Sequence, residues 1–172
     1  MKIFIASMLL LPFSVLSQTV KLDGASTTVK FDIEDVEEGT VSGIKIDADL
    51  NLDDPSKSWI KATADASTLN TGSSERDKHI THDAEGGYID VTATPTFKFE
   101  TSKIVKTESG WMAYGKLTIG GVTQDVTMPF IKDGKKLVGR IKIHTGNFGI
   151  HADKPSDPSA INCIIRIETT IK

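Results

Sequence analysis

The sequence contains very little cysteine: Cys163 is the single one among 172 residues. One cysteine cannot form an internal disulfide, so the fold must be held by packing and hydrogen bonds alone. Cys163 alternates with Ile165 and Ile167 along a β-like segment. An apolar neighbourhood of this kind is typical of a free cysteine that acts as a small buried hydrophobe.

Positive charge is also scarce, because 20 lysines and arginines face 23 acidic residues and give a net charge of -3. Nucleic-acid-binding proteins need a basic stripe, and anionic membranes attract basic segments, so neither partner is predicted. The sequence also lacks a Gly-x-Ser-x-Gly motif, a cysteine beside a base and a phosphate-binding loop. Its carboxylates fall on outward, alternating positions. We therefore expect no enzyme activity and no cofactor.

Long hydrophobic runs are absent except at the start, where residues 3–16 follow the positively charged Lys2 and end just before Ser17. A short apolar run between a positive residue and small residues is typical of a secretory signal peptide. An uncleaved anchor is the alternative, but it needs about 20 apolar residues. We predict a signal peptide over residues 1–17, one mature domain over residues 18–172, export to the periplasm or medium, and no stable membrane insertion.

Alternation of apolar and polar residues dominates the rest of the chain. Period-two alternation predicts strands with one face in a core and one in water. The breaker residues between these segments favour antiparallel hairpins. The pattern predicts an all-β fold, an eight-stranded antiparallel barrel, with one short helix within Asn70–Thr94 covering an end. The eight segments are Val29–Ile33, Ser42–Leu52, Trp59–Ser67, Thr96–Ser102, Trp111–Ile119, Val122–Ile131, Lys136–Ile143 and Ile161–Ile171.

The Gly120-Gly121 pair predicts one hairpin in detail. A two-residue turn pairs Ile119 with Val122, and each further step outward pairs the next two residues. This register places a nearly apolar set of side chains on the inner face, with Gln124 as its one polar member. It places Lys116 opposite Asp125 on the wet face, which is a favourable cross-strand pair.

The inward-facing set includes many small residues, Ala and Gly, which fill less of a barrel than large aliphatic side chains. Two alternatives remain open: facing residues reach across and fill the barrel, or an apolar ligand occupies the space. For the second alternative, the candidate lining residues are Phe31, Ala64, Phe97, Phe99, Ala113, Leu117, Ile119, Val126, Met128, Phe130, Ile141 and Ile143.

Three segments resemble a known family. Residues 65–72 read DASTLNTG and are followed by RDKHI at 76–80; Asp90-Val91 precedes PTFKF at 95–99; and residues 115–126 read GKLTIGGVTQDV. Together they resemble the signatures of the YceI-like family, polyisoprenoid-binding proteins of the bacterial envelope. The resemblance implies a lipocalin-like barrel with a small helix and an apolar tunnel that holds an isoprenoid or similar lipid.

The sequence departs from that family pattern at Tyr88-Ile89, at Thr94 and at Glu34-Asp35. These positions lie near a barrel end. Head-group recognition and chain length are therefore the features that the resemblance transfers least.

Polar residues in the predicted helix suggest a role at the barrel rim. Arg76, Asp77 and His79 either meet a lipid head group or pin the helix to the barrel through local hydrogen bonds and charges. His79 and His82 are three residues apart and could share a helix face toward a metal ion, but a third ligand is not assured. We therefore predict no metal site.

The leading hypothesis is an exported carrier or store for an isoprenoid or another long-chain lipid. The alternatives are an envelope stress-response or interaction module with a filled barrel, and a hydrolase or isomerase that uses Gln124 on a bound lipid. A homodimer is left open, as are the identity of the lipid and the choice between carrier, store and sensor.

Overall fold

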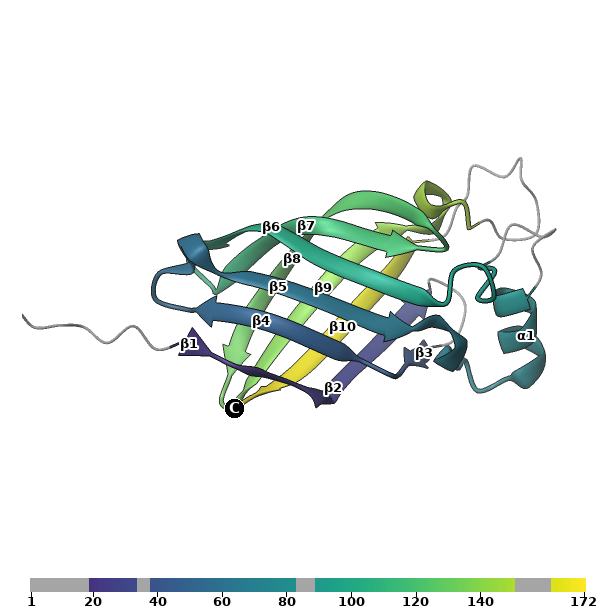
Figure 1. The fold of residues 1–172 in the computed structure, drawn as a ribbon, viewed down its shortest axis with the longest axis horizontal. Coiled ribbons are helices and arrows are strands. Elements are labelled where there is room, and N and C mark those ends of the chain that lie inside the picture. Colours follow the sequence, from purple (N-terminus) through teal and green to yellow (C-terminus); the bar gives the residue numbers. More distant parts are fainter. Residues whose placement is uncertain (1–18, 34–37, 83–88, 151–161) are drawn as a thin grey trace, which may run out of the picture.

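The computed structural model describes residues 19–33, 38–82, 89–150 and 162–172, and these form one curled antiparallel sheet (Figure 1). The strand order is β1-β4-β5-β6-β7-β8-β9-β10-β2-β3. The strands are β1 Thr19–Val20, β2 Leu22–Ile33, β3 Glu38–Val41, β4 Lys45–Asn51, β5 Trp59–Asp65, β6 Thr96–Lys106, β7 Trp111–Ile119, β8 Val122–Asp133, β9 Lys136–His144 and β10 Asn162–Ile171.

All eight predicted strands are present, but the sheet has ten strands rather than eight. The additions are β1 and β3, which are two and four residues long. Glu38-Gly39 is one of the breaker pairs that favour a turn by sequence, but in the structure it opens β3. Gly39 pairs with Phe31, and a Cβ at Gly39 would lie 2.1 Å from the phenyl ring. This glycine therefore makes room for an aromatic ring rather than for a turn.

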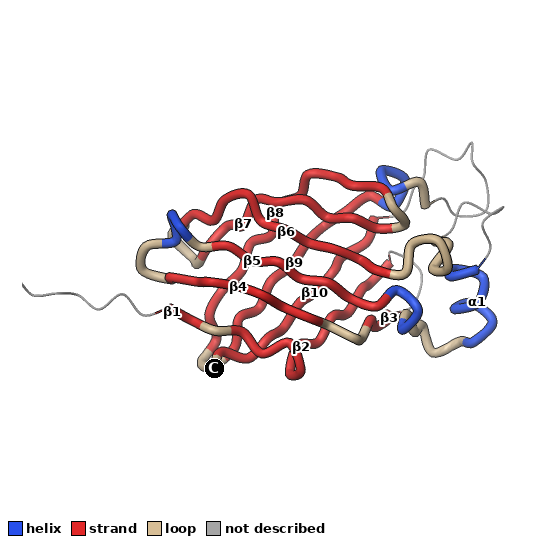
Figure 2. Tube along the Cα trace, in the orientation of Figure 1, coloured by secondary structure: helices blue, strands red, loops and turns tan. Residues whose placement is uncertain are grey.

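The N-terminal segment draws the two edges of the sheet together. β1 pairs with β4, with Val20 opposite Leu50, whereas β2 pairs with β10, with Phe31 opposite Ile165. Only Lys21 separates β1 from β2, so one short stretch of chain contacts both edges. The sheet therefore curls into a barrel, and Figure 2 shows how strands dominate it.

The β7–β8 hairpin has the predicted register, from Ile119 opposite Val122 to Ala113 opposite Met128. Gly120 and Gly121 have φ of 56° and 79°, the left-handed values that a two-residue hairpin turn requires. On the wet face, Lys116 Nζ lies 2.9 Å from Asp125 Oδ1. The predicted register places Val122 on the inner face together with Ile119, and this assignment is wrong. Val122 is 37% exposed, because its position beside the turn leaves its side chain at the rim instead of in the core.

The predicted helix is α1, Ser74–His82, at one end of the barrel, and the C-terminus lies at the opposite end (Figure 1). The helix begins after Ser73, whose Oγ accepts a hydrogen bond from the Arg76 amide. Glu75 and Asp77 add negative charge to the first turn, which favours the helix dipole. Short 3-10 turns occupy η1 Pro55–Lys57, η2 Ala66–Thr68 and η4 Thr145–Phe148.

The predicted signal peptide, residues 1–17, lies outside the described residues. In the part of the chain that the structure describes, no helix is long and apolar enough to cross a membrane.

Candidate functional site

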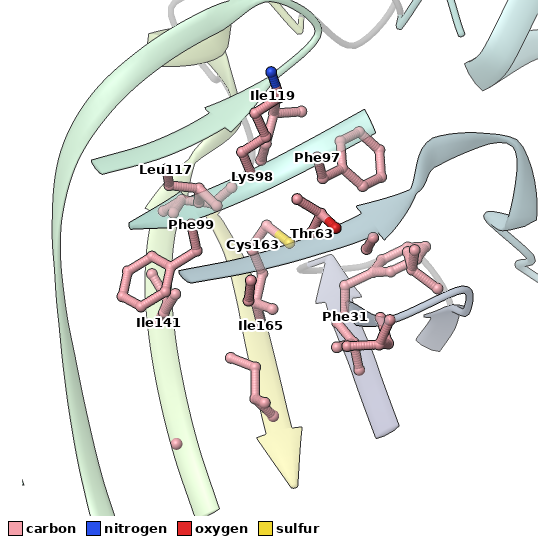
Figure 3. A pocket seen from close by; sticks show the side chains of 18 of the residues that line it. Phe31, Thr63, Phe97, Lys98, Phe99, Leu117, Ile119, Ile141, Cys163 and Ile165 are labelled. Atoms are coloured by element: carbon pink, nitrogen blue, oxygen red, sulfur yellow. The ribbon is translucent and has the colours of Figure 1, made fainter. Parts of the chain in front are cut away.

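A cavity of about 400 Å³ runs inside the barrel. Its walls come from strands β2 to β10 together with α1, and most of the side chains that face it are apolar. The charged or titratable side chains among the lining residues, apart from the thiol of Cys163, are Arg76, His79 and Lys98. Figure 3 shows side chains from β5, β6, β7, β9 and β10 converging on this single space. Alternation explains the arrangement, since every second residue of each strand points inward.

Ten of the twelve candidate lining residues face the cavity. Met128 and Phe130 come from β8, and Ile141 and Ile143 from β9. Figure 3 shows Phe97, Phe99, Leu117 and Ile119 around the same space. The ten are Phe31, Ala64, Phe97, Phe99, Leu117, Ile119, Met128, Phe130, Ile141 and Ile143.

Ala113 and Val126, the other two candidates, do not line the cavity. Ala113 is 0% exposed and lies between Ile104 and Met128 in the sheet. The larger neighbours cover its methyl group, so a small inward residue here means tight packing and not empty space. Val126 lies on the part of β8 that pairs only with β7, because the described pairing with β9 begins at Phe130.

Much of the wall formed by β2 and β10 is not among the candidate lining residues predicted from the sequence. Val29, Ile165 and Ile167 line the cavity, and their alternation was the signal that could have identified them. Leu22 and Thr27 gave no such signal. The register between β10 and β2 shifts between Glu168 and Thr170, which interrupts the period of two in β2.

The polar residues of α1 have different roles. Arg76 and His79 line the cavity at the end of the barrel where α1 lies. Asp77 does not; its Oδ1 accepts hydrogen bonds from the Thr71 amide at 2.8 Å and the Thr71 hydroxyl at 2.6 Å. Asp77 therefore pins the helix to the preceding loop, the second of the two roles considered for it. The side chain of His82 lies outside the described part of the structure.

The opposite end of the cavity holds a pair of hydroxyl groups. Thr27 Oγ1 and Thr169 Oγ1 are 2.7 Å apart, and Thr27 also donates to the Asp23 carbonyl at 2.8 Å. Both side chains line the cavity and are buried. Because they bond to each other and to the main chain, they complete this end without an unpaired polar group.

Cys163 lies in the wall of the cavity (Figure 3). Burial, with a smaller contribution from the nearby negative charge of Asp32, raises the pKa of its thiol to about 12. The thiol is therefore protonated at neutral pH and is a poor nucleophile and metal ligand. Among the described residues, no group of three or more His, Cys, Asp or Glu side chains is placed to hold a metal ion.

The model of the YceI-like domain matches residues 20–172. The chain belongs to this family. A UPF0312 protein of Serratia proteamaculans is 29% identical over 180 residues, which cover 94% of this chain and 91% of that protein. A UPF0312 protein of Pseudomonas aeruginosa is 31% identical over 86 residues, which cover 50% of this chain and 41% of that protein.

Solved structures of other proteins share the fold. The crystal structure of Burkholderia cenocepacia BcnA has a TM-score of 0.73 at 18% identity and covers 88% of this chain and 99% of its own. A Campylobacter jejuni YceI protein has a TM-score of 0.62 at 21% identity, covering 82% and 88%. A polyisoprenoid-binding domain from Saccharophagus degradans has a TM-score of 0.54 at 8% identity, covering 90% and 97%. These likenesses support a lipocalin-like YceI fold.

Proposed function

We propose that this protein binds a long apolar chain, an isoprenoid or a similar lipid, inside its barrel and serves as a carrier or store. The observation that carries the proposal is the continuous apolar cavity of about 400 Å³. This volume falls within the range of about 300–1,000 Å³ that is usual for small-molecule sites. The polyisoprenoid-binding domain of Saccharophagus degradans, which has the same fold, is consistent with such a ligand.

The energetics favour an occupied cavity. Without a ligand, the apolar side chains that line this cavity would face water or empty space, and both are unfavourable for apolar surface. A bound chain recovers about 0.8 kcal/mol for each methylene that it buries. A filled, ligand-free barrel, the main alternative, does not account for this space.

The α1 end is the natural place for the polar end of the lipid. Arg76 and His79 are the cationic or titratable side chains that α1 contributes to the cavity wall. They lie three residues apart, and thus on one side of the helix. We propose that they contact a polar head group while the apolar tail runs along the barrel.

We also propose that binding, and not catalysis, is the role of this cavity. The thiol of Cys163 is held protonated, and Gln124, once a candidate for chemistry on a lipid, does not line the cavity. Its Nε2 instead donates to the Asn147 carbonyl at 2.7 Å.

Native mass spectrometry of protein purified from its own host, followed by organic extraction, tests the binding proposal. We expect a bound species whose mass matches a molecule with a long apolar chain. Protein that carries no lipid, and that shows no saturable uptake of prenyl lipids in titration, would contradict it.

Export is a separate part of the proposal and rests on the apolar run at residues 3–16 after Lys2. We expect the mature protein to begin within a residue or two of Gln18 in the envelope or medium fraction. N-terminal sequencing of that fraction tests it, and an intact Met1 would contradict it.

A further inference from the structure

The two ends of the cavity differ in their access to solvent. At the α1 end, His79 is exposed and Arg76 is half-buried, although both line the cavity. At the opposite end, Thr27, Leu137 and Thr169 line the cavity but are only 9%, 4% and 5% exposed. Leu22 also lines the cavity at this end and is half-buried. Within the described ranges, the lining residues at the opposite end are therefore more deeply buried than Arg76 and His79, although not all of them are fully buried.

Main-chain hydrogen bonds close the far end. The Ile171 amide donates to the Lys135 carbonyl at 2.8 Å, and the Lys172 amide donates to the Lys21 carbonyl at 2.9 Å. They tie the C-terminal strand to the β8–β9 turn on one side and to the start of β2 on the other. The hydroxyl pair of Thr27 and Thr169 lies inside this closure.

The wall beside the far end is solid. Leu50 and Ala113 are both fully buried without lining the cavity. Trp111 stacks on Phe130 with ring centroids 5.6 Å apart, and its indole N–H donates to the Leu52 carbonyl at 3.0 Å. Protein cores are close-packed, so these buried side chains leave little space beside the cavity at this end.

We propose that this closed end limits the length of the chain that fits, and that Leu137 is the residue that sets the limit. The inference rests on the proposed lipid-binding function. Leu137 pairs with Lys132 of β8 and Thr169 of β10, and it is the lining residue of β9 that lies furthest from α1. A chain that enters from the α1 end gains contacts with each added carbon until it meets this side chain.

Binding of straight-chain 1-alkanols, which differ in steps of two carbons, tests the proposal on delipidated protein. Affinity should rise by about tenfold per step while the chain is still being buried, and then level off. Leu137→Ala removes three carbon atoms from the end wall. The affinity should therefore level off one step, or two carbons, later than in the wild type.

Leu117→Ala is the matched control. Leu117 is also a leucine that lines the cavity and is 6% exposed, but it stands in the side wall on β7. This variant should change affinity at all lengths and leave the levelling length unchanged. Because Leu→Ala can destabilise a core, Leu137→Phe provides a test in the opposite direction: it should bring the levelling one step earlier.

The outcomes are distinct. If the affinity of the wild type keeps rising with alkanol length and never levels off, the proposal that the cavity has a closed end is wrong. An unchanged levelling length in both Leu137 variants, or the same shift in Leu117→Ala, would overturn the role of Leu137. If no alkanol of any length binds the wild type, the proposed lipid-binding function itself fails, and the length limit fails with it.

Discussion

Placing the same substitution, Ala→Leu, at two inward positions tests whether the cavity is real. Ala64 lines the cavity on β5, opposite Phe97, whereas Ala113 is fully buried without facing it. Both residues are small, inward and on strands, so the sequence alone treats them alike. The structure predicts opposite effects on stability.

The magnitudes follow from the surroundings. Leucine adds three carbon groups to alanine, and at about 0.8 kcal/mol each their burial is worth roughly 2.4 kcal/mol. Ala64→Leu has empty space to fill, so the ligand-free protein should be stabilised by up to that amount. Ala113→Leu must push against Ile104 and Met128, and overpacking of this kind costs about 1–3 kcal/mol. The two variants should therefore differ in free energy of unfolding by roughly 3–5 kcal/mol.

The two variants should also differ in lipid affinity, and here Ala64→Leu should have the larger unfavourable effect. In Ala64→Leu the new carbon atoms occupy space that the ligand would use, and a loss of roughly 2.4 kcal/mol weakens binding about 50-fold. Ala113→Leu should bind almost as the wild type does. Urea denaturation of lipid-free protein and a displacement titration with a prenyl alcohol provide the two measurements. Equal destabilisation by both substitutions would show that Ala64 faces a filled core, and the cavity argument would then be wrong.

Three further predictions test other parts of the structure. Leu117→Asp should destabilise the protein by several kcal/mol, because it buries a charge. Lys116→Asp lies on the exposed face and should cost less than about 1 kcal/mol. Equal shifts in the urea midpoint of the two variants would show that the inner and outer faces are assigned the wrong way round. Above pH 9 the Cys163 thiol ionises in the unfolded chain but not in the folded one, whose pKa is about 12, so stability should fall as pH rises between these values. The slope of the free energy of unfolding against pH approaches about 1.4 kcal/mol per pH unit. Cys163→Ala should lack this loss of stability, and a variant with the same pH dependence as the wild type would contradict burial of the thiol. Asp77→Ala should cost about 1–3 kcal/mol, because it leaves the buried amide and hydroxyl of Thr71 without their acceptor; an unchanged melting temperature would show that the helix is held elsewhere.

The features that the sequence predicts correctly are those governed by neighbouring residues. Period-two alternation depends only on the chain within one strand, so it identified Ile141 and Ile143, which line the cavity, and left out the exposed Lys142 between them. A Gly-Gly turn fixes the register of the two strands that it joins, and this gave the β7–β8 hairpin in full.

The features that it missed depend on residues far apart in the chain. β3 exists because Gly39 accepts the ring of Phe31 against it. Thr27 faces the cavity because β2 shifts register against β10, and its hydrogen-bond partner Thr169 is 142 residues away. Whether Ala113 borders a void or a packed core depends on the size of Ile104 and Met128 across two strand pairings. No local pattern reports any of these.

The local signature segments that identify the family cover only part of the barrel, so they do not determine every feature of the cavity. The three signature segments lie in the half of the barrel near α1. Residues 65–80 include most of the helix, and residues 95–99 lie at the start of β6. Residues 115–126 surround a turn where a Cβ at Gly121 would lie 3.2 Å from Thr94. Leu137, Thr27 and Thr169, which close the other end, fall outside all three segments. Proteins that share these signatures can therefore share the entrance and the apolar wall while differing at the closed end. The length of lipid that each protein accepts then depends on the residues at the closed end of its own cavity, and it cannot be inferred from the family signatures.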